Sequence, residues 1–401
     1  MTAAADQAPR VNAESALVPD VDFDLHGFVG LRLLAATAPD VAMLTRQIGP
    51  VRSPLARRPD ITVRFVDRID DEQPMTYAEW LGSGFTDSSF YVLRGRDGVP
   101  ARALLPLGDI GTGVNIVCER RAGSVPHLLA IINLVALSNG VLPLHASAFV
   151  TSVAGGDNVG VLATGWAKGG KTETLLAFAS RGARYVGDEW VYVTPDGSMF
   201  GVPEPIRLWH WHVRQLPDLL SRLPRSTRLR LAALPAAARL ASALSRQLPT
   251  GSLPSSVLRR AAPVIGRQAY VQVPPAELFG TGSIAPRGTL DALLLLVTHD
   301  REDVSVHTVA GGEVGQRMLA SLEEERAPFM ACYREFRFGF PALRSETVES
   351  APARERELMD RTFGDRLAHV VRHPYPISFQ RLVEPISEIL ISLSHDQGRT
   401  P

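Results

Sequence analysis

One short stretch constrains this chain more than any other, namely Gly165-Trp166-Ala167-Lys168-Gly169-Gly170-Lys171-Thr172. It fits the phosphate-loop (Walker A) pattern G-x-x-x-x-G-K-[ST] without a gap. The apolar run over 159–163 predicts a buried strand before the loop, and residues 173–180 predict a helix after it. A loop in this context places backbone N–H groups and a helix N-terminus where they can bind a polyphosphate.

The pattern assigns a role to each polar side chain of the loop. Gly165 and Gly170 bracket a turn that needs glycine's backbone freedom. Lys171 can reach the β- and γ-phosphates of ATP, and the Thr172 hydroxyl can ligate Mg²⁺. Lys168 and Lys171 are the only lysines in the chain, because every other cationic residue among the 42 Lys+Arg is arginine. A compact ammonium fits a tight phosphate site better than a planar guanidinium does, which supports nucleotide binding here.

Composition excludes several other classes of function. The formal net charge is +0, so nothing in the overall charge favours nucleic acid or an anionic membrane surface. No apolar run reaches the ~20 residues of a membrane span, and the N-terminus lacks the pattern of a secretory signal. The two cysteines, Cys118 and Cys332, favour a reducing compartment without a disulfide framework. We therefore expect a cytoplasmic protein.

Patterning predicts an α/β chain with a tail over 1–20, a small α+β domain over 21–122, a phosphate-loop domain over 123–393 and a second tail over 394–401. Within the second domain, residues from about 213 to 267 are rich in Leu, Ala, Pro and Arg, which predicts a helical insertion. That insertion is either a solvated helical face or a mobile lid that attracts an acidic substrate.

Local periodicity predicts individual elements. Strands are expected over 25–34, 61–66, 90–93, 103–107, 114–117, 290–297, 336–340 and 368–372. Helices are expected over 40–47, 124–137, 315–325 and 379–393. Residues 142–150 start the core of the second domain, residues 184–193 form two strands around an acidic pair, and residues 201–208 are irregular.

The acidic pair is Asp188 and Glu189, which follow a strand one helical crossover after the loop. One acid can hold Mg²⁺ together with Thr172, and the other can accept the proton of an acceptor hydroxyl; the sequence leaves open which does which. His145 can contact the γ-phosphate or this pair. His210 and His212 share a strand pattern but lack a third metal ligand, so packing or substrate contact is favoured there. Arg207 is a weak candidate for an anion contact.

These residues resemble the catalytic domain of HPr kinase/phosphorylase. That family carries a histidine before its loop, a G-K-S-E-T helix start, and an R-G-H-R-L stretch leading to two acids. Here the matching residues are His145, Gly170-Lys171-Thr172-Glu173-Thr174, Arg181-Gly182-Ala183-Arg184-Tyr185 and Asp188-Glu189. The match covers about residues 144–193. The second acid is Glu where the family has Asp, and Glu204 is a loose counterpart of the family's later metal-holding glutamate.

The resemblance implies a phosphoenolpyruvate carboxykinase-like core with a mixed sheet, which uses ATP and Mg²⁺ to phosphorylate a hydroxyl. It implies that His145, Lys171, Asp188 and Glu189 are catalytic. The acceptor is a serine of a peptide or protein, or a small molecule, and a homo-oligomer is left open. Two other functions remain: an ATP-binding regulatory or scaffold module that transfers nothing, and a nucleotidase whose acceptor is water.

Overall fold

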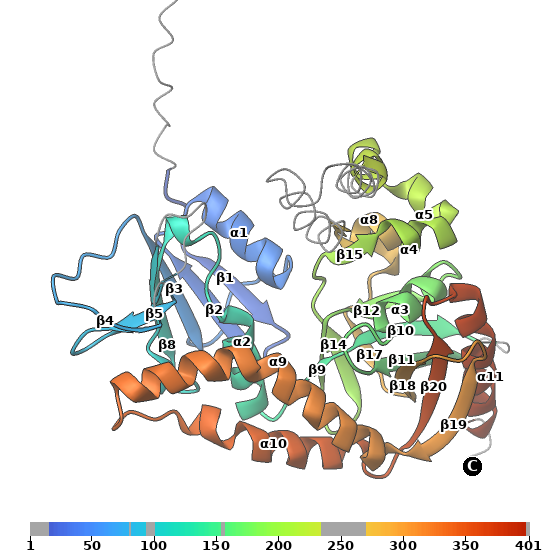
Figure 1. The fold of residues 1–401 in the computed structure, drawn as a ribbon. Coiled ribbons are helices and arrows are strands. Elements are labelled where there is room, and N and C mark those ends of the chain that lie inside the picture. Colours follow the sequence, from blue (N-terminus) through green and yellow to red (C-terminus); the bar gives the residue numbers. More distant parts are fainter. Residues whose placement is uncertain (1–15, 80–81, 94–100, 154–156, 234–269, 398–401) are drawn as a thin grey trace, which may run out of the picture.

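The chain is an α/β protein built on two large mixed sheets and one long helix that contacts both (Figure 1). The computed structural model describes residues 16–79, 82–93, 101–153, 157–233 and 270–397. Residues 1–15 and 398–401 of the predicted tails, and residues 234–269 of the predicted insertion, lie outside the described residues. No helix of the described ranges is long and apolar enough to span a bilayer.

The N-terminal sheet has eight strands with a parallel centre, β2, β3 and β8, flanked by antiparallel pairs. Its side chains alternate between the core and the outer face, as in β3, where Ile61, Val63 and Phe65 are buried. The spatial order is β1 (Val21–Leu25), β2 (Val29–Leu34), β3 (Ile61–Val66), β8 (Val114–Glu119), β7 (Arg102–Leu104), β6 (Phe90–Leu93), β5 (Ser83–Phe85) and β4 (Thr76–Glu79).

The expectation of one continuous strand over 25–34 is wrong. The chain turns between β1 and β2, where the Gly27 N–H donates to Asp24 Oδ1 at 2.8 Å. Gly27 has a φ of 81°, which glycine adopts without strain. Residues on both sides of this turn are apolar because both strands bury side chains. The sequence pattern therefore did not indicate where the first strand ends and the second begins.

The second large sheet carries the phosphate loop. Its order is β12 (Arg184–Gly187), β10 (Ser147–Ser152), β11 (Asn158–Thr164), β18 (Ala292–His299), β20 (Leu367–Pro374) and β19 (Ser305–Ala310). The strands β11, β18 and β20 are parallel at its centre. Both faces are covered, which explains the unbroken apolar run of β18.

The remaining strands form two smaller sheets. A four-stranded sheet contains β17 (Arg287–Thr289), β14 (Ser198–Gly201), β13 (Trp190–Val193) and β9 (Leu142–His145), and β15 (Ile206–Trp209) pairs with β16 (Tyr270–Val273). The stretch 201–208, expected to be irregular, therefore ends in a strand. The predicted core segment 142–150 is split into β9 and β10 at Ala146, so that one half enters each sheet.

The described helices include α1 (Ala38–Ile48), α2 (Leu128–Ser138), α3 (Lys171–Ala179), α4 (His210–Gln215), α5 (Pro217–Arg222), α8 (Pro275–Phe279), α9 (Gly311–Gly339), α10 (Glu346–Phe363) and α11 (Phe379–Gln397), with 3₁₀ turns at Leu107–Asp109, Arg120–Ala122 and Thr281–Ser283. Residues 225–233 are also helical. Thr37 and Asp40 form a capping box at the start of α1.

The long helix α9 joins the two halves of the molecule. Figure 1 shows it beneath both sheets, and it contacts β4 and β5 on one side and β19 and β20 on the other. The expectation of a strand over 336–340 is wrong, since α9 continues to Gly339. Phe329, Tyr333 and Phe336 follow helical spacing: Phe329 stacks on Tyr333, and Tyr333 packs at a tilt against Phe336. Phe336 packs edge-on against Phe90, with 5.7 Å between ring centroids.

Close backbone packing next to the loop gives a stability prediction. A Cβ built on Gly160 of β11 would lie 1.8 Å from the carbonyl oxygen of Thr289. Because backbone must shift to make room, Gly160→Ala is expected to lower the free energy of unfolding by about 1–3 kcal/mol in urea denaturation. Gly312→Ala is the control, since a Cβ there meets nothing within 4 Å. Equal stability of the two variants would contradict this packing.

Candidate active site

The phosphate-loop segment joins β11 to α3, in the strand, loop and helix order that the sequence predicts. Gly165 and Gly170 have φ values of 145° and 102°. A Cβ at Gly165 would lie 2.5 Å from the carbonyl oxygen of Leu296, and one at Gly170 would lie 2.9 Å from His373 Nε2. Both positions therefore require glycine, on grounds of conformation and of space.

Lys171 is buried at the first position of α3. Its Nζ donates to the carbonyl oxygens of Gly165 at 2.9 Å and Trp166 at 3.0 Å, which holds the ammonium inside the curve of the loop. Burial lowers its pKa, and the charges of Asp188 and Glu189 partly offset that effect. The other lysine, Lys168, is exposed and has a φ of 64°.

Asp188 directly follows β12 and faces the start of the loop helix. Its two carboxylate oxygens each accept from the Thr172 hydroxyl at 3.1 Å, and Oδ1 also accepts from Ser147. Burial, followed by the neighbouring charge of Glu189, raises the pKa of Asp188 to about 7. A hydroxyl and a carboxylate together form the hard oxygen donor set that Mg²⁺ favours.

Glu189 turns the other way, because it adopts a φ of 67° in a tight turn. The turn is closed by the Ala146 N–H, which donates to the Glu189 carbonyl at 3.1 Å, and by the Trp190 N–H, which donates to the Asp188 carbonyl at 2.9 Å. A positive φ is rare for a residue other than glycine and is held here by its surroundings. The two adjacent acids thus face different partners.

The side chain of Glu189 meets His145 at the end of β9, with 3.3 Å between Oε2 and Nε2. Arg207 Nη1 lies 3.7 Å from the other oxygen of Glu189. Burial alone would raise the pKa of Glu189, but the hydrogen bond with His145 and the charge of Arg207 lower it. Three residues that the sequence singled out, His145, Glu189 and Arg207, therefore form one cluster, and His145 contacts the acidic pair as one of its two predicted alternatives.

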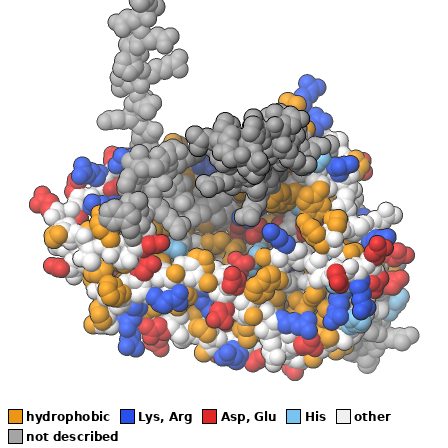
Figure 2. All heavy atoms as spheres, in the orientation of Figure 1, with side chains coloured by type: hydrophobic (Ala, Val, Ile, Leu, Met, Phe, Trp, Pro, Cys, Tyr) orange, Lys and Arg blue, Asp and Glu red, His pale blue; other side chains and the backbone are white. Residues whose placement is uncertain are grey.

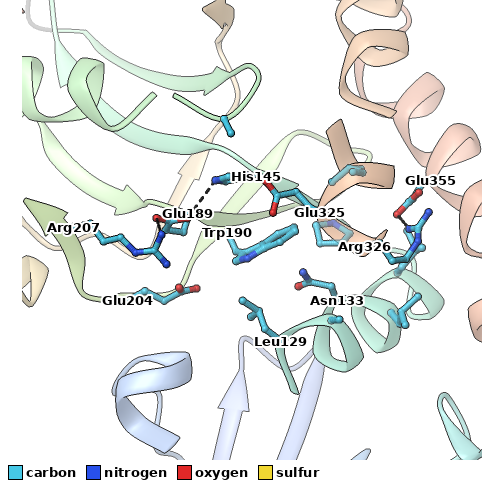
Figure 3. Close-up of a pocket in the computed structure, with 16 residues that line it drawn as sticks. Leu129, Asn133, His145, Glu189, Trp190, Glu204, Arg207, Glu325, Arg326 and Glu355 are labelled. Carbon is cyan, nitrogen blue, oxygen red and sulfur yellow. Dashed lines mark hydrogen bonds and ion pairs between the residues drawn. The ribbon is translucent and has the colours of Figure 1, made fainter. Parts of the chain in front are cut away.

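Sequence reasoning missed Glu325, which extends the cluster from α9. Its Oε1 lies 2.5 Å from His145 Nδ1, so the imidazole is held between two carboxylates (Figure 3). Burial acts to lower the pKa of His145, but the hydrogen bonds with Glu189 and Glu325 outweigh it and raise that pKa. Nothing in the local sequence around 325 indicates this contact, which spans 180 residues.

This contact gives a second prediction. Glu325→Gln is expected to lower the pKa of His145, because the variant keeps the side-chain shape but removes one of the two carboxylates that stabilise the imidazolium. An NMR titration of labelled histidine measures it, with His145→Asn to assign the resonance. The control is Glu324→Gln, one residue away and exposed. An unchanged His145 titration in Glu325→Gln would rule the contact out.

A cavity of about 440 Å³ opens beside the loop, between α2, α9 and the β9–β13 pair. His145, Glu189 and the loop residue Ala167 line one part of it (Figure 3). The remaining lining combines charged and apolar side chains: Leu129, Ala130, Asn133, Leu134, Leu137, Pro143, Trp190, Glu204, Arg207, Leu322, Glu325, Arg326 and Glu355. Its size is that of a small-molecule or side-chain pocket.

The other residues singled out from the sequence lie around this centre. Trp166, Ala167 and Lys168 form the exposed tip of the loop, and the Gly169 carbonyl lies 2.8 Å from the buried His373 Nε2, a neighbour that the sequence did not suggest. His212 lies 3.1 Å from Glu173 and packs against Trp211, which fits the packing alternative for the 209–212 segment.

The site can also be judged by the metal ion that its side chains could bind. The described part of the chain holds no cluster of three or more His, Cys, Asp or Glu arranged to bind a metal ion. Mg²⁺ at a phosphate site usually keeps several waters and binds one or two carboxylates of the protein, so Thr172 and Asp188 fit this ion. On the face drawn in Figure 2, outside the grey atoms, acidic and basic side chains are interspersed.

Compared with known protein families and with curated proteins, the sequence matches none.

Proposed function

We propose that this chain is an ATP- and Mg²⁺-dependent kinase that transfers the γ-phosphoryl group to a hydroxyl acceptor, on a phosphoenolpyruvate carboxykinase-like core of the HPr kinase/phosphorylase type. One observation carries the proposal: the two acids of the turn separate, with Asp188 at Thr172 beside the loop and Glu189 at His145 beside the cavity. Such a division suits a reaction that needs a metal on one side and an acceptor on the other.

Each group then has a role in a balanced step. The acceptor oxygen forms a bond to the γ-phosphorus while the bond to the β–γ bridging oxygen breaks and ADP leaves. Glu189 accepts the proton of the acceptor hydroxyl, and His145 positions the Glu189 carboxylate through the contact between them. The Lys171 ammonium offsets the charge on the phosphates. Thr172 and Asp188 would hold Mg²⁺, which supplies further charge neutralisation when bound.

Two alternatives compete with transfer to a hydroxyl. A regulatory ATP-binding module needs no acceptor cavity, whereas here Glu189 and His145 line one. A nucleotidase needs only a water beside Glu189. The apolar side chains of Leu129, Leu134 and Trp190 on the cavity wall favour an organic acceptor over water.

The test is transfer of label from γ-labelled ATP into a size-fractionated host extract, with Asp188→Asn as the inactive control. Label in a discrete peptide or small-molecule fraction, absent with the variant, supports the kinase. Free phosphate as the sole product points to a nucleotidase. Nucleotide binding without either product points to the regulatory module.

A further inference from the structure

The charges that line the cavity pair with one another, with one exception. Arg326 pairs with Glu355, Glu325 pairs with His145, and Glu189 contacts both His145 and Arg207. Glu204 differs: its Oε1 atom is buried and has no hydrogen-bond partner. Figure 3 shows its carboxylate directed into the cavity below Glu189.

The position of Glu204 is fixed by the backbone. It lies between Pro203 and Pro205 in the link from β14 to β15, and its N–H donates to the Val202 carbonyl at 2.8 Å. Proline on either side restricts the backbone dihedral angles here, which fixes the point from which the side chain of Glu204 extends. A buried carboxyl oxygen without a partner is costly, which marks this position as one that a ligand completes.

The chemistry of that ligand follows from the surroundings. Burial and the negative charges of Glu189 and Asp188 raise the pKa of Glu204 well above its ordinary value. A positively charged nitrogen would reverse this effect, because it supplies both an opposite charge and N–H donors. The lining also includes apolar side chains, among them Leu129, Leu134 and Trp190.

We infer that this cavity binds the acceptor of the proposed reaction, and that the acceptor is an amino alcohol: a primary hydroxyl at Glu189, an ammonium group within a few bonds of it at Glu204, and an apolar part along the wall of α2. The role of the hydroxyl as the phosphoryl acceptor rests on the proposed kinase function. The cavity and the unpaired carboxyl oxygen of Glu204 do not depend on that function.

A matched pair of probes tests the inference on the full chain. Phenylalaninol carries the hydroxyl, the ammonium and an apolar ring, and 3-phenylpropan-1-ol lacks only the ammonium. Calorimetric titration is expected to show phenylalaninol binding at least about tenfold more tightly, because its ammonium group pairs with the buried carboxyl group of Glu204. Glu204→Gln is expected to remove that difference while ATP affinity stays unchanged. Leu129→Trp, which fills the cavity, is expected to abolish binding of both probes.

The outcomes separate this inference from the proposed function. Equal affinity for the two probes overturns the inference that the acceptor is an amino alcohol. An unchanged preference for phenylalaninol in Glu204→Gln overturns it as well. Loss of Mg²⁺-dependent ATP binding in Glu204→Gln instead assigns the carboxylate to the metal and also overturns it. If phenylalaninol binds through Glu204 but never accepts label from γ-labelled ATP under any nucleotide condition, the ligand class stands and the kinase function fails.

Discussion

Replacing Lys171 with methionine is expected to reduce ATP-dependent label transfer by a factor on the order of 10²–10³, the size of effect seen when one preorganised charge or donor at a reacting centre is removed. Methionine keeps the length of the side chain but carries no charge. The Lys171 ammonium lies within hydrogen-bond distance of two loop carbonyls, so it is already held where a polyphosphate would bind. ATP affinity should fall as well, measured by calorimetric titration.

The same loop provides a matched control. Lys168 is the only other lysine of the chain, lies three residues away and is exposed. Lys168→Met changes the net charge by the same amount, so a general electrostatic effect would affect both variants alike. Equal losses in the two variants, or an unaffected Lys171→Met, would contradict a specific role for the buried ammonium.

The loop could be predicted from the sequence because all its determinants are local. Strand, glycines, lysine and helix lie within 25 residues, and the structure places β11, the loop and α3 in that order. The strands around the acidic pair were predictable for the same reason, since β12 and β13 are short apolar runs on either side of Asp188 and Glu189. A mixed α/β fold followed from these alternating patterns.

Contacts between distant segments could not be predicted. Glu325 reaches His145 only because α9 runs from one sheet to the other, and no periodicity in the sequence fixes that path. His373 reaches the Gly169 carbonyl through the parallel pairing of β20 with β18. The separation of Asp188 from Glu189 depends on a positive φ at Glu189, which is disfavoured for this residue type and which tertiary contacts impose.

Replacing Asp188 with asparagine is expected to abolish measurable label transfer, with a loss on the order of 10³-fold or more. Asparagine keeps the shape and can still accept from Thr172 and Ser147, but it removes the negative charge that would hold Mg²⁺. ATP binding measured without Mg²⁺ should be retained, whereas the gain in affinity on adding Mg²⁺ should disappear. Retained transfer would assign the metal to other residues.

The same substitution, Asp188→Asn, should raise the stability of the protein at alkaline pH although it abolishes label transfer. Asp188 has its pKa raised from 3.8 to about 7 by burial, so the folded state binds this proton more tightly than the unfolded state does. For an acid shifted in this direction, stability is lost as the pH rises from the unfolded pKa towards the folded one, because the unfolded chain ionises first. At about pH 8 the ionised carboxylate costs at most about 4 kcal/mol, from 1.36 kcal/mol per pH unit.

Asp188→Asn removes that cost, so without metal or nucleotide the variant should gain stability over the parent protein as the pH rises from about 4 to about 8. Urea denaturation at several pH values measures this difference, and Asp218→Asn is the control, since Asp218 is exposed on α5. A variant that is less stable at every pH would mean that the stronger hydrogen bonds that a charged carboxylate accepts from Ser147 and Thr172 outweigh the cost of burying its charge. A gain in stability with a loss of transfer would identify Asp188 as a residue retained for its chemistry at the expense of the fold.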